Sequence, residues 1–173
     1  SGPWIEAETL PFKNLKEFWA LSRESESFEY SVAWFDCTTK SGRGIFTRGN
    51  HSAETRHAKT PKTLNFPLTP PFSLINRLTL KPLNLAYYIL GKFAAGSKTV
   101  YYRPFFYPLD AITNWNRAYG RRGFFQHQCV IPKRSEEQAL EELLSEIRRA
   151  NAGSLLAVLK TTGERNPPGL LTF

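Results

Sequence analysis

Several features that would assign a chain to a class at once are scarce or missing here. Cysteine occurs only twice in 173 residues, at Cys37 and Cys129, which excludes a disulfide scaffold. We expect each of the two to be a buried free thiol. No apolar run approaches the roughly 20 residues that a membrane-spanning helix needs. The opening residues, SGPWIEAETLPF, do not show the basic and then apolar pattern of a signal peptide, so we expect none.

The signatures of self-contained catalysis are also lacking. The sequence holds no glycine-rich phosphate loop and no convincing arrangement of serine, histidine and aspartate. His51 and His57 have no plausible third ligand, so we expect no metal site. What the chain does have is a hydrophobic content of 41%, enough for one domain core, and a net charge of +8. The excess charge gathers in residues 43–62 and 117–122 and favours anionic partners.

The first part of the chain predicts strands and one helix. Alternating apolar and polar residues over 4–10 indicate a half-buried strand that Pro11 ends. Asn14, followed by a glutamate three residues later, has the spacing of a helix-capping box. The aromatic and β-branched stretch at 28–37, FEYSVAWFDC, predicts a second strand. Residues 42–48, GRGIFTR, predict a third strand that pairs with it as a hairpin.

The last part of the chain follows the same order. Residues 123–131, GFFQHQCVI, predict a strand closed by a proline. Ser135 and Gln138 have capping-box spacing, and Gly153 is the expected end of the helix that they begin. Residues 154–163, SLLAVLKTTG, predict the next strand. The expected apolar face of the helix is formed by Leu140, Leu143, Leu144 and Ile147.

The middle of the chain is less regular. Residues 51–71 are polar and proline-rich and predict a long loop. Residues 71–93 are apolar and partly helix-like, with an interruption expected at Pro82. Taken together, these elements favour an α+β fold with a mainly antiparallel sheet and helices packed on one face of it.

Two interpretations remain open for the strand predicted at 123–131. Its period of two puts Gln126 and Gln128 on one face and His127 on the other. Paired glutamines on a face are either a solvent-facing polar stripe or hydrogen-bonding groups in a wet pocket. The basic–glycine–aromatic start is also faintly similar to an RNA-recognition strand. Phe124 and Phe125 are adjacent and point to opposite faces, which weakens the RNA interpretation.

Two further places carry candidate binding groups. Prolines within the aromatic segment 101–119 restrict it to an edge or a pocket rim. Asp110 is a candidate cap for a short helix carrying Trp115, Asn116 and Arg117. In the last predicted strand, alternation places Lys160 on the same face as Val158, where its amine either reaches solvent at an edge or binds an anionic or hydroxylic ligand.

The stretch FFYPLDAITNWNRAYGRRGFFQHQCVIP, residues 105–132, resembles the FAD-linked oxidases related to decaprenylphosphoryl-β-D-ribose 2′-oxidase. EYSVAWFDC, GRGIFTRGN and LLAVLKTTGERNPPGLLTF follow the order of that family. The resemblance implies that residues 1–173 are a fragment of the substrate-binding domain, inserted in a vanillyl-alcohol-oxidase-type FAD domain that is absent from this chain.

The resemblance also implies a site and a reaction. It suggests no catalytic residue in this fragment and no role for His127 in the mechanism. The reaction implied is oxidation of the ribose 2′-hydroxyl of a polyprenyl-phosphoryl sugar, with hydride transfer to FAD bound mainly by the absent domain. The substrate-binding residues that it implies are Trp34, Phe106, Leu109, Asn116, Arg117, Gln126, Gln128 and Lys160.

The expected partners follow from this reaction. They are a lipid-linked phosphorylated sugar, the FAD domain of the same protein and an NADH-dependent short-chain reductase, with no nucleic acid. Residues 78–93 are expected to cover the lipid tail or to make a peripheral membrane contact. A bacterial cytoplasmic or membrane-associated location is favoured over secretion. The alternatives are the substrate domain of another FAD-linked sugar or polyol oxidase and a basic nucleic-acid-binding module.

Overall fold

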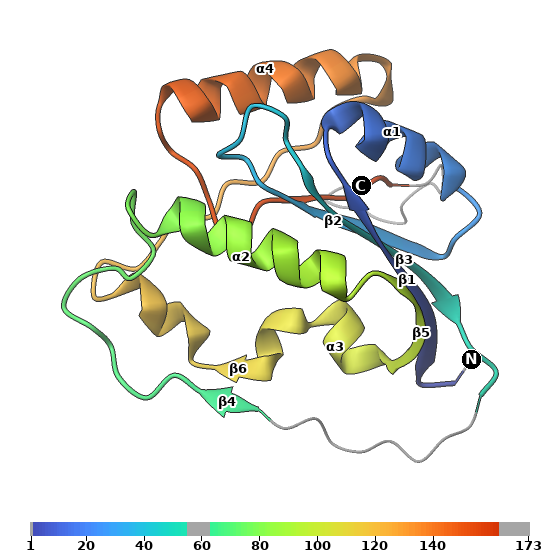
Figure 1. The fold of residues 1–173 in the computed structure, drawn as a ribbon, viewed down its shortest axis with the longest axis horizontal. Helices are drawn as coiled ribbons and strands as arrows, with labels where there is room; N and C mark the ends of the chain where they lie inside the picture. The colour runs from blue at the N-terminus through green and yellow to red at the C-terminus, as the bar shows by residue number, and fades with distance from the viewer. Residues whose placement is uncertain (1, 55–62, 163–173) are drawn as a thin grey trace, which may run out of the picture.

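The computed structural model describes residues 2–54 and 63–162, which form an α+β fold around one main sheet (Figure 1). The order of the strands in the sheet is β5-β1-β3-β2-β7, and every neighbouring pair is antiparallel. This confirms the predicted fold class and the mainly antiparallel sheet. The strands of this sheet are β1 (Trp4–Phe12), β2 (Tyr30–Phe35), β3 (Gly44–His51), β5 (Gly96–Tyr101) and β7 (Val158–Leu159).

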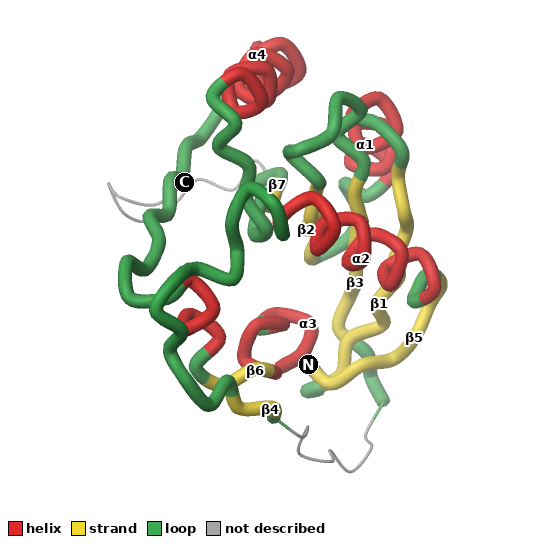
Figure 2. The backbone as a smooth tube through the Cα atoms, turned by 60° about the vertical axis from the view of Figure 1, so that its left-hand side comes forward, coloured by secondary structure: helices red, strands yellow, loops and turns green. Residues whose placement is uncertain are grey.

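The remaining elements lie around this sheet. A separate parallel pair consists of β4 (Leu64–Asn65) and β6 (Ile112–Thr113). Figure 2 shows this pair close to α3 and away from α1 and α4. The α-helices are α1 (Leu15–Glu24), α2 (Leu80–Phe93), α3 (Tyr102–Phe106) and α4 (Glu136–Arg149). The short 3-10 helices within the described residues are η1 (Pro108–Ala111), η2 (Trp115–Tyr119) and η3 (Lys133–Ser135).

Helices cover both faces of the sheet, whereas the sequence had predicted one covered face. On one face, Phe35 and Phe46 pack with residues of α1 and with Leu144 of α4. Trp34 and Ile45 point to the opposite face because side chains alternate along a strand, and they pack against α2. Figure 1 shows α1 and α4 on one side of the sheet and α2 on the other. The second layer forms because α2 has an apolar row that can pack on the sheet.

Of the predicted helix ends, the start of α1 is confirmed, while the capping box and the terminating glycine predicted for α4 are not. The side chain of Asn14 accepts a hydrogen bond from the Glu17 backbone nitrogen at 2.9 Å, which confirms the cap of α1. The capping box predicted for α4 is wrong, because Gln138 donates instead to the side chain of Glu142 at 2.8 Å. α4 ends at Arg149, and the left-handed residue after its C-cap is Asn151, with a φ of 51°, instead of the predicted Gly153.

Contrary to the prediction, Pro11 does not end its strand and Pro82 does not interrupt its helix. Pro11 lies inside β1, beyond the last residue of β1 that pairs with β5, so the missing N–H faces an unpaired edge. Pro82 lies in the first turn of α2, where a backbone N–H has no partner within the helix. The sequence alone did not show whether each proline would end its strand or helix or be accommodated within it.

The predicted strands differ in outcome. The hairpin of β2 and β3 is confirmed, and the strand predicted at 154–163 is present only as its two residues in β7. The strand predicted at 123–131 is wrong, because this segment is irregular and pairs with no described strand. Within the loop predicted at 51–71, β4 forms, and residues 55–62 lie outside the described part. β5 was not predicted at all.

Leu144 tests whether α4 is an integral part of the core. Its side chain is 1% exposed, so Leu144→Ala is expected to lower the free energy of unfolding by about 2–4 kcal/mol. Leu143 is only half-buried, and Leu143→Ala should cost about 1 kcal/mol or less. Urea denaturation of both variants measures the difference, and equal losses would contradict the packing described for α4.

Candidate functional site

Trp34, Lys160 and Phe106 lie on the side of the sheet that α2 covers. Trp34 is opposite Val158 in the β2–β7 pairing, and alternation places Lys160, which follows β7, on the same side. Val158 and Lys160 are exposed there, as the predicted shared face requires, while Leu159 packs into the core on the other side. The structure therefore brings a predicted aromatic wall and a predicted amine to one face.

Trp34 is held in place by a hydrogen bond from its indole nitrogen and by packing of its ring. Its indole nitrogen donates a hydrogen bond to the backbone oxygen of Leu155 at 2.7 Å. Its ring packs on Tyr87 of α2 with ring centroids 4.5 Å apart, and the residue is only 7% exposed. Burial raises the pKa of the Tyr87 hydroxyl. With its polar atom already used and its ring largely covered, Trp34 offers a ligand only a small exposed part of its ring.

Phe106 comes to this face through α3. Its ring meets that of Tyr30 of β2 with centroids 4.8 Å apart, and the Tyr30 hydroxyl is 3.1 Å from the His51 ring. α3 is held next to the start of β1 by a hydrogen bond of 2.9 Å from the Tyr102 backbone nitrogen to the backbone oxygen of Pro3. Phe106 is 37% exposed, so it keeps free surface for a ligand.

Gly49 makes the approach of α3 possible. A Cβ atom at Gly49 would lie 2.8 Å from a methyl group of Ile5 and 3.2 Å from the ring of Phe105, so a larger residue would push the helix outward. Leu109, another predicted pocket residue, is half-buried in η1, directly after α3. The position of Leu109 thus depends on the same helix.

Arg117 and Asn116 lie in η2, which opens after the left-handed Asn114, so the cap predicted at Asp110 is wrong. Arg117 donates to the backbone oxygens of Phe66 at 3.1 Å and of the next residue at 3.0 Å. It fixes the segment around β4 against η2. Asn116 is exposed and borders two open hollows, one of which Arg117 also lines. The predicted place of both residues on a rim stays a prediction.

Gln126 and Gln128 lie in the irregular segment after η2. Both are exposed, and neither forms a hydrogen bond with another of the described residues. The neighbouring Phe125 is fully exposed, and Cys129 is exposed too, against the expectation of a buried thiol. The structure does not bring the two glutamines into contact with Trp34 or Lys160. Their role in binding stays a prediction.

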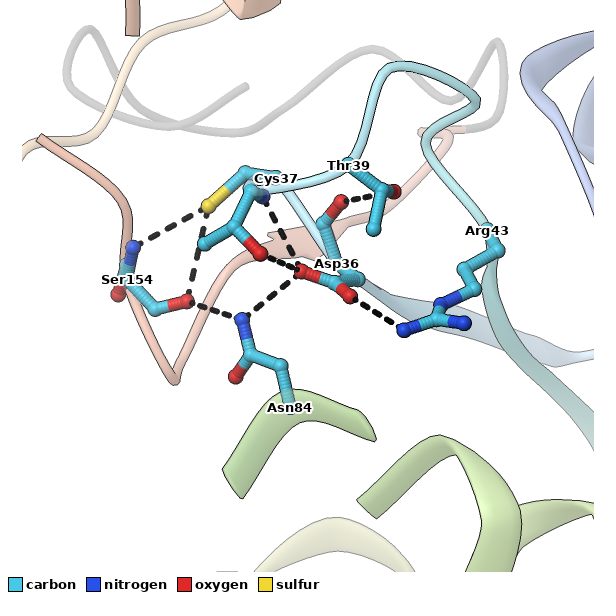
Figure 3. A network of polar contacts seen from close by, with 7 residues as sticks. Asp36, Cys37, Thr39, Arg43, Asn84 and Ser154 are labelled. Atoms are coloured by element: carbon cyan, nitrogen blue, oxygen red, sulfur yellow. Dashed lines mark hydrogen bonds and ion pairs between the residues drawn. The ribbon is translucent and has the colours of Figure 1, made fainter. Parts of the chain in front are cut away.

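A buried polar network that the sequence reasoning missed lies next to this face (Figure 3). The carboxylate of Asp36 is fully buried and accepts hydrogen bonds from the Asn84 amide at 3.0 Å and from the Thr38 hydroxyl at 2.6 Å. The Arg43 guanidinium lies 3.2 Å from its second oxygen. Asn84 also donates to the backbone oxygen of Ser154 at 3.3 Å. The network therefore joins the β2–β3 hairpin, α2 and the segment before β7.

Cys37 lies at the edge of this network. The Ser154 nitrogen donates to its sulfur at 3.2 Å, and the thiol is buried, as predicted for this cysteine. Burial raises the pKa of the Cys37 thiol, and the nearby charge of Asp36 raises it further. A neutral, buried thiol of this kind is unreactive. The signals for the network were two polar residues, Asp36 and Asn84, in otherwise apolar surroundings.

The groups on this face can bind a ligand. Aromatic rings and a cationic amine on one face suit a ligand with both apolar and anionic or hydroxylic parts. Within residues 2–54 and 63–162, no three acidic, histidine or cysteine side chains come together as a metal site. In the same ranges, no helix has the length and apolar character to cross a membrane.

Comparison with known proteins relates the chain to an oxidase. It is 31% identical over 154 residues to decaprenylphosphoryl-beta-D-ribose oxidase of Mycolicibacterium smegmatis. The match covers 81% of this chain and 33% of that protein, so the chain spans about a third of the length of this relative. No family model matches the chain. The similarity supports a relation between this chain and one part of the oxidase.

Asn84 is expected to be a main contributor to stability. Asn84→Ala removes the donor to a buried carboxylate and should lower the free energy of unfolding by about 2 kcal/mol. Asn84→Asp should cost more, because it places a second carboxylate against Asp36. Asn116→Ala, at an exposed asparagine, is the control and should stay within about 0.5 kcal/mol of wild type. Chemical denaturation at neutral pH ranks the three variants, and an equal effect of all three would be inconsistent with the network.

The two cysteines should differ sharply in reactivity. In the folded protein, Cys129 is exposed and should react with a thiol reagent, while Cys37 should react only after denaturation. Mass spectrometry of peptides labelled at neutral pH, with and without urea, measures both sites. The variant Cys129→Ser should abolish labelling under native conditions. Rapid labelling of Cys37 in that variant would refute its burial.

Proposed function

We propose that this chain is the substrate-binding part of an FAD-dependent oxidoreductase that oxidises the ribose 2′-hydroxyl of a polyprenyl-phosphoryl sugar. The observation that carries the proposal is the 31% identity over 81% of the chain to an oxidase named for a decaprenylphosphoryl ribose. The face bearing Trp34, Phe106 and Lys160 supports it, because its chemistry suits such a ligand. The remainder of a longer protein would supply the redox centre.

The flavin does not fit the residues of this chain. A dinucleotide needs groups that bind its pyrophosphate, such as a glycine-rich loop at a helix N-terminus, and the sequence has no loop of this kind. We therefore assign FAD to the part of the protein outside residues 1–173. FAD supplies hydride acceptance when bound. No residue of this chain is assigned a catalytic role.

The residues on the candidate face would hold and orient the sugar. The free surface of Phe106 would form an apolar wall, and the small exposed part of the Trp34 ring would add to it. The Lys160 ammonium would donate a hydrogen bond to a ribose hydroxyl or to the phosphate. Gln126 and Gln128, which are exposed, would add amide hydrogen bonds to the sugar hydroxyls.

The partners follow from the chemistry of the product. Oxidation of a secondary hydroxyl leaves a ketone, and epimerisation then requires its reduction from the other face. An NADH-dependent short-chain reductase would complete that step. The other proposed partners are the lipid-linked sugar and the FAD domain of the same protein, which would pack near Leu109, Asn116 and Arg117.

The visible spectrum of the full-length protein tests the proposal. Oxidised flavin absorbance that bleaches on anaerobic addition of polyprenyl-phosphoryl ribose is the expected result. A flavin spectrum that bleaches only with an unrelated polyol would replace the substrate and keep the class of oxidase. A colourless protein would overturn the proposal and favour a binding module, for which salt-sensitive RNA binding dependent on Phe124 is the next assay.

Lys160 and Gln128 test the assignment of the binding face. Lys160→Ala and Gln128→Ala in the full-length enzyme should each raise the dissociation constant for the lipid-linked sugar at least about tenfold, because each removes a hydrogen bond to the ligand. Lys13→Ala, at an exposed lysine next to α1, is the matched control and should leave it unchanged. Fluorescence titration of the flavin gives the three constants. Wild-type affinity in both site variants would remove these residues from the site.

A further inference from the structure

α2 exposes an apolar surface that no described residue covers. One row of the helix, formed by Leu80, Asn84 and Tyr88, is buried against the sheet. The opposite side exposes 67% of Leu90 and 85% of Phe93. A helix that is apolar on all sides is normally buried on all sides. The outer side of α2 is therefore an apolar surface that we expect to bind a partner.

Exposed apolar side chains are concentrated in the same part of the chain. Among the described residues, every exposed large apolar side chain lies between positions 64 and 158, and seven lie within 78–93. Contiguous exposure of this kind marks a contact surface more often than a scatter of single residues does. The seven side chains in and beside α2 are Leu78, Leu83, Leu85, Tyr87, Ile89, Leu90 and Phe93.

The charge of this part of the chain is of one sign. Between Glu54 and Asp110 the sequence contains no acidic residue, whereas it contains several lysines and arginines. Of the 15 acidic residues, eight precede residue 55 and six follow residue 135. Many of these lie on α1 and α4, which Figure 1 shows across the sheet from α2. The side of the molecule that exposes apolar groups is thus also its cationic side.

We propose that α2 binds the surface of a membrane that contains anionic lipids. The helix of 14 residues would lie flat in the interface, with Leu90 and Phe93 among the acyl chains. Arg77 and Lys81 at its start and Lys92 at its end are exposed and would meet the lipid phosphates. The absence of acidic residues from this segment removes the repulsion that such a surface would otherwise meet, which favours a lipid occupant over another part of the protein.

The position of α2 links this surface to the candidate site. Tyr87 of α2 packs directly on Trp34, so the membrane-facing helix also forms one wall of the face that would bind the sugar. This link rests on the proposed function, whose substrate carries a polyprenyl chain that resides in a bilayer. An interfacial α2 would bring the site to the headgroup region, where the phosphate and ribose of that substrate lie.

Vesicle co-sedimentation of the full-length protein tests the proposal. The protein should bind vesicles of equal parts phosphatidylcholine and phosphatidylglycerol, and should bind phosphatidylcholine alone far more weakly. The double variant Leu90→Asn with Phe93→Asn should lower partitioning more than about tenfold, because both anchors are lost. Leu90→Met with Phe93→Leu keeps the apolar surface and should bind like wild type.

Charge variants separate insertion from simple attraction. Arg77→Gln and Lys81→Gln should each weaken binding about fivefold, while Arg149→Gln on α4, across the sheet, should have no effect. Equal binding by wild type and the double asparagine variant would overturn the proposal. So would protection of the Leu90 and Phe93 side chains from hydroxyl-radical labelling in the lipid-free full-length protein, which would show that another part of the protein covers the outer side of α2.

The outcome is separable from that of the proposed function. Flavin bleaching with a short-chain, water-soluble polyprenyl-phosphoryl ribose needs no vesicle, so it reports the reaction alone. Bleaching without vesicle binding would leave the oxidase proposal intact and remove the membrane contact. Vesicle binding without bleaching would support the contact and remove its link to this substrate.

Discussion

The carboxylate of Asp36 is the interaction on which the arrangement of this fold depends. A buried charge is costly unless it is paired and hydrogen-bonded, and Asp36 is fully buried. Its two oxygens are met by Arg43, which directly precedes β3, by Thr38 from the turn and by Asn84 from α2. Removing any one donor would leave part of that cost without compensation. The carboxylate therefore selects one relative placement of hairpin and helix out of the many that apolar packing alone would allow.

The same network positions the candidate binding face. Asn84 and Cys37 both contact Ser154, and Trp34 bonds to the next residue, Leu155. These contacts hold the segment that leads into β7, a strand of only two residues that its own ladder would fix poorly. Lys160 lies directly beyond that strand. The position of Lys160 on the Trp34 side of the sheet therefore depends on this buried polar network.

Some local signals in the sequence predicted local structure correctly, although the α4 capping box was wrong, and the failure of the strand predicted at 123–131 had a nonlocal cause. The Asn14 cap and the apolar face of α4 depend on residues three or four positions apart, and both were confirmed. The strand predicted at 123–131 has suitable residues, but a strand also needs a neighbour, and no described segment pairs with it. Trp34, Phe106 and Lys160 share a face through a sheet register that no single stretch encodes. The identity of these candidates came from resemblance, and their placement came from the fold.

The rotation of α2 about its own axis explains how one helix can serve both the core and a surface. Because α2 is apolar on nearly every side, hydrophobic packing alone would accept several rotations against the sheet. Asn84 removes this freedom, since any other rotation would take its amide away from Asp36 and Ser154. A single buried polar residue can fix register in this way. The rotation that satisfies Asn84 is also the one that turns Leu90 and Phe93 outward, so the internal polar bond decides which apolar side chains the molecule presents.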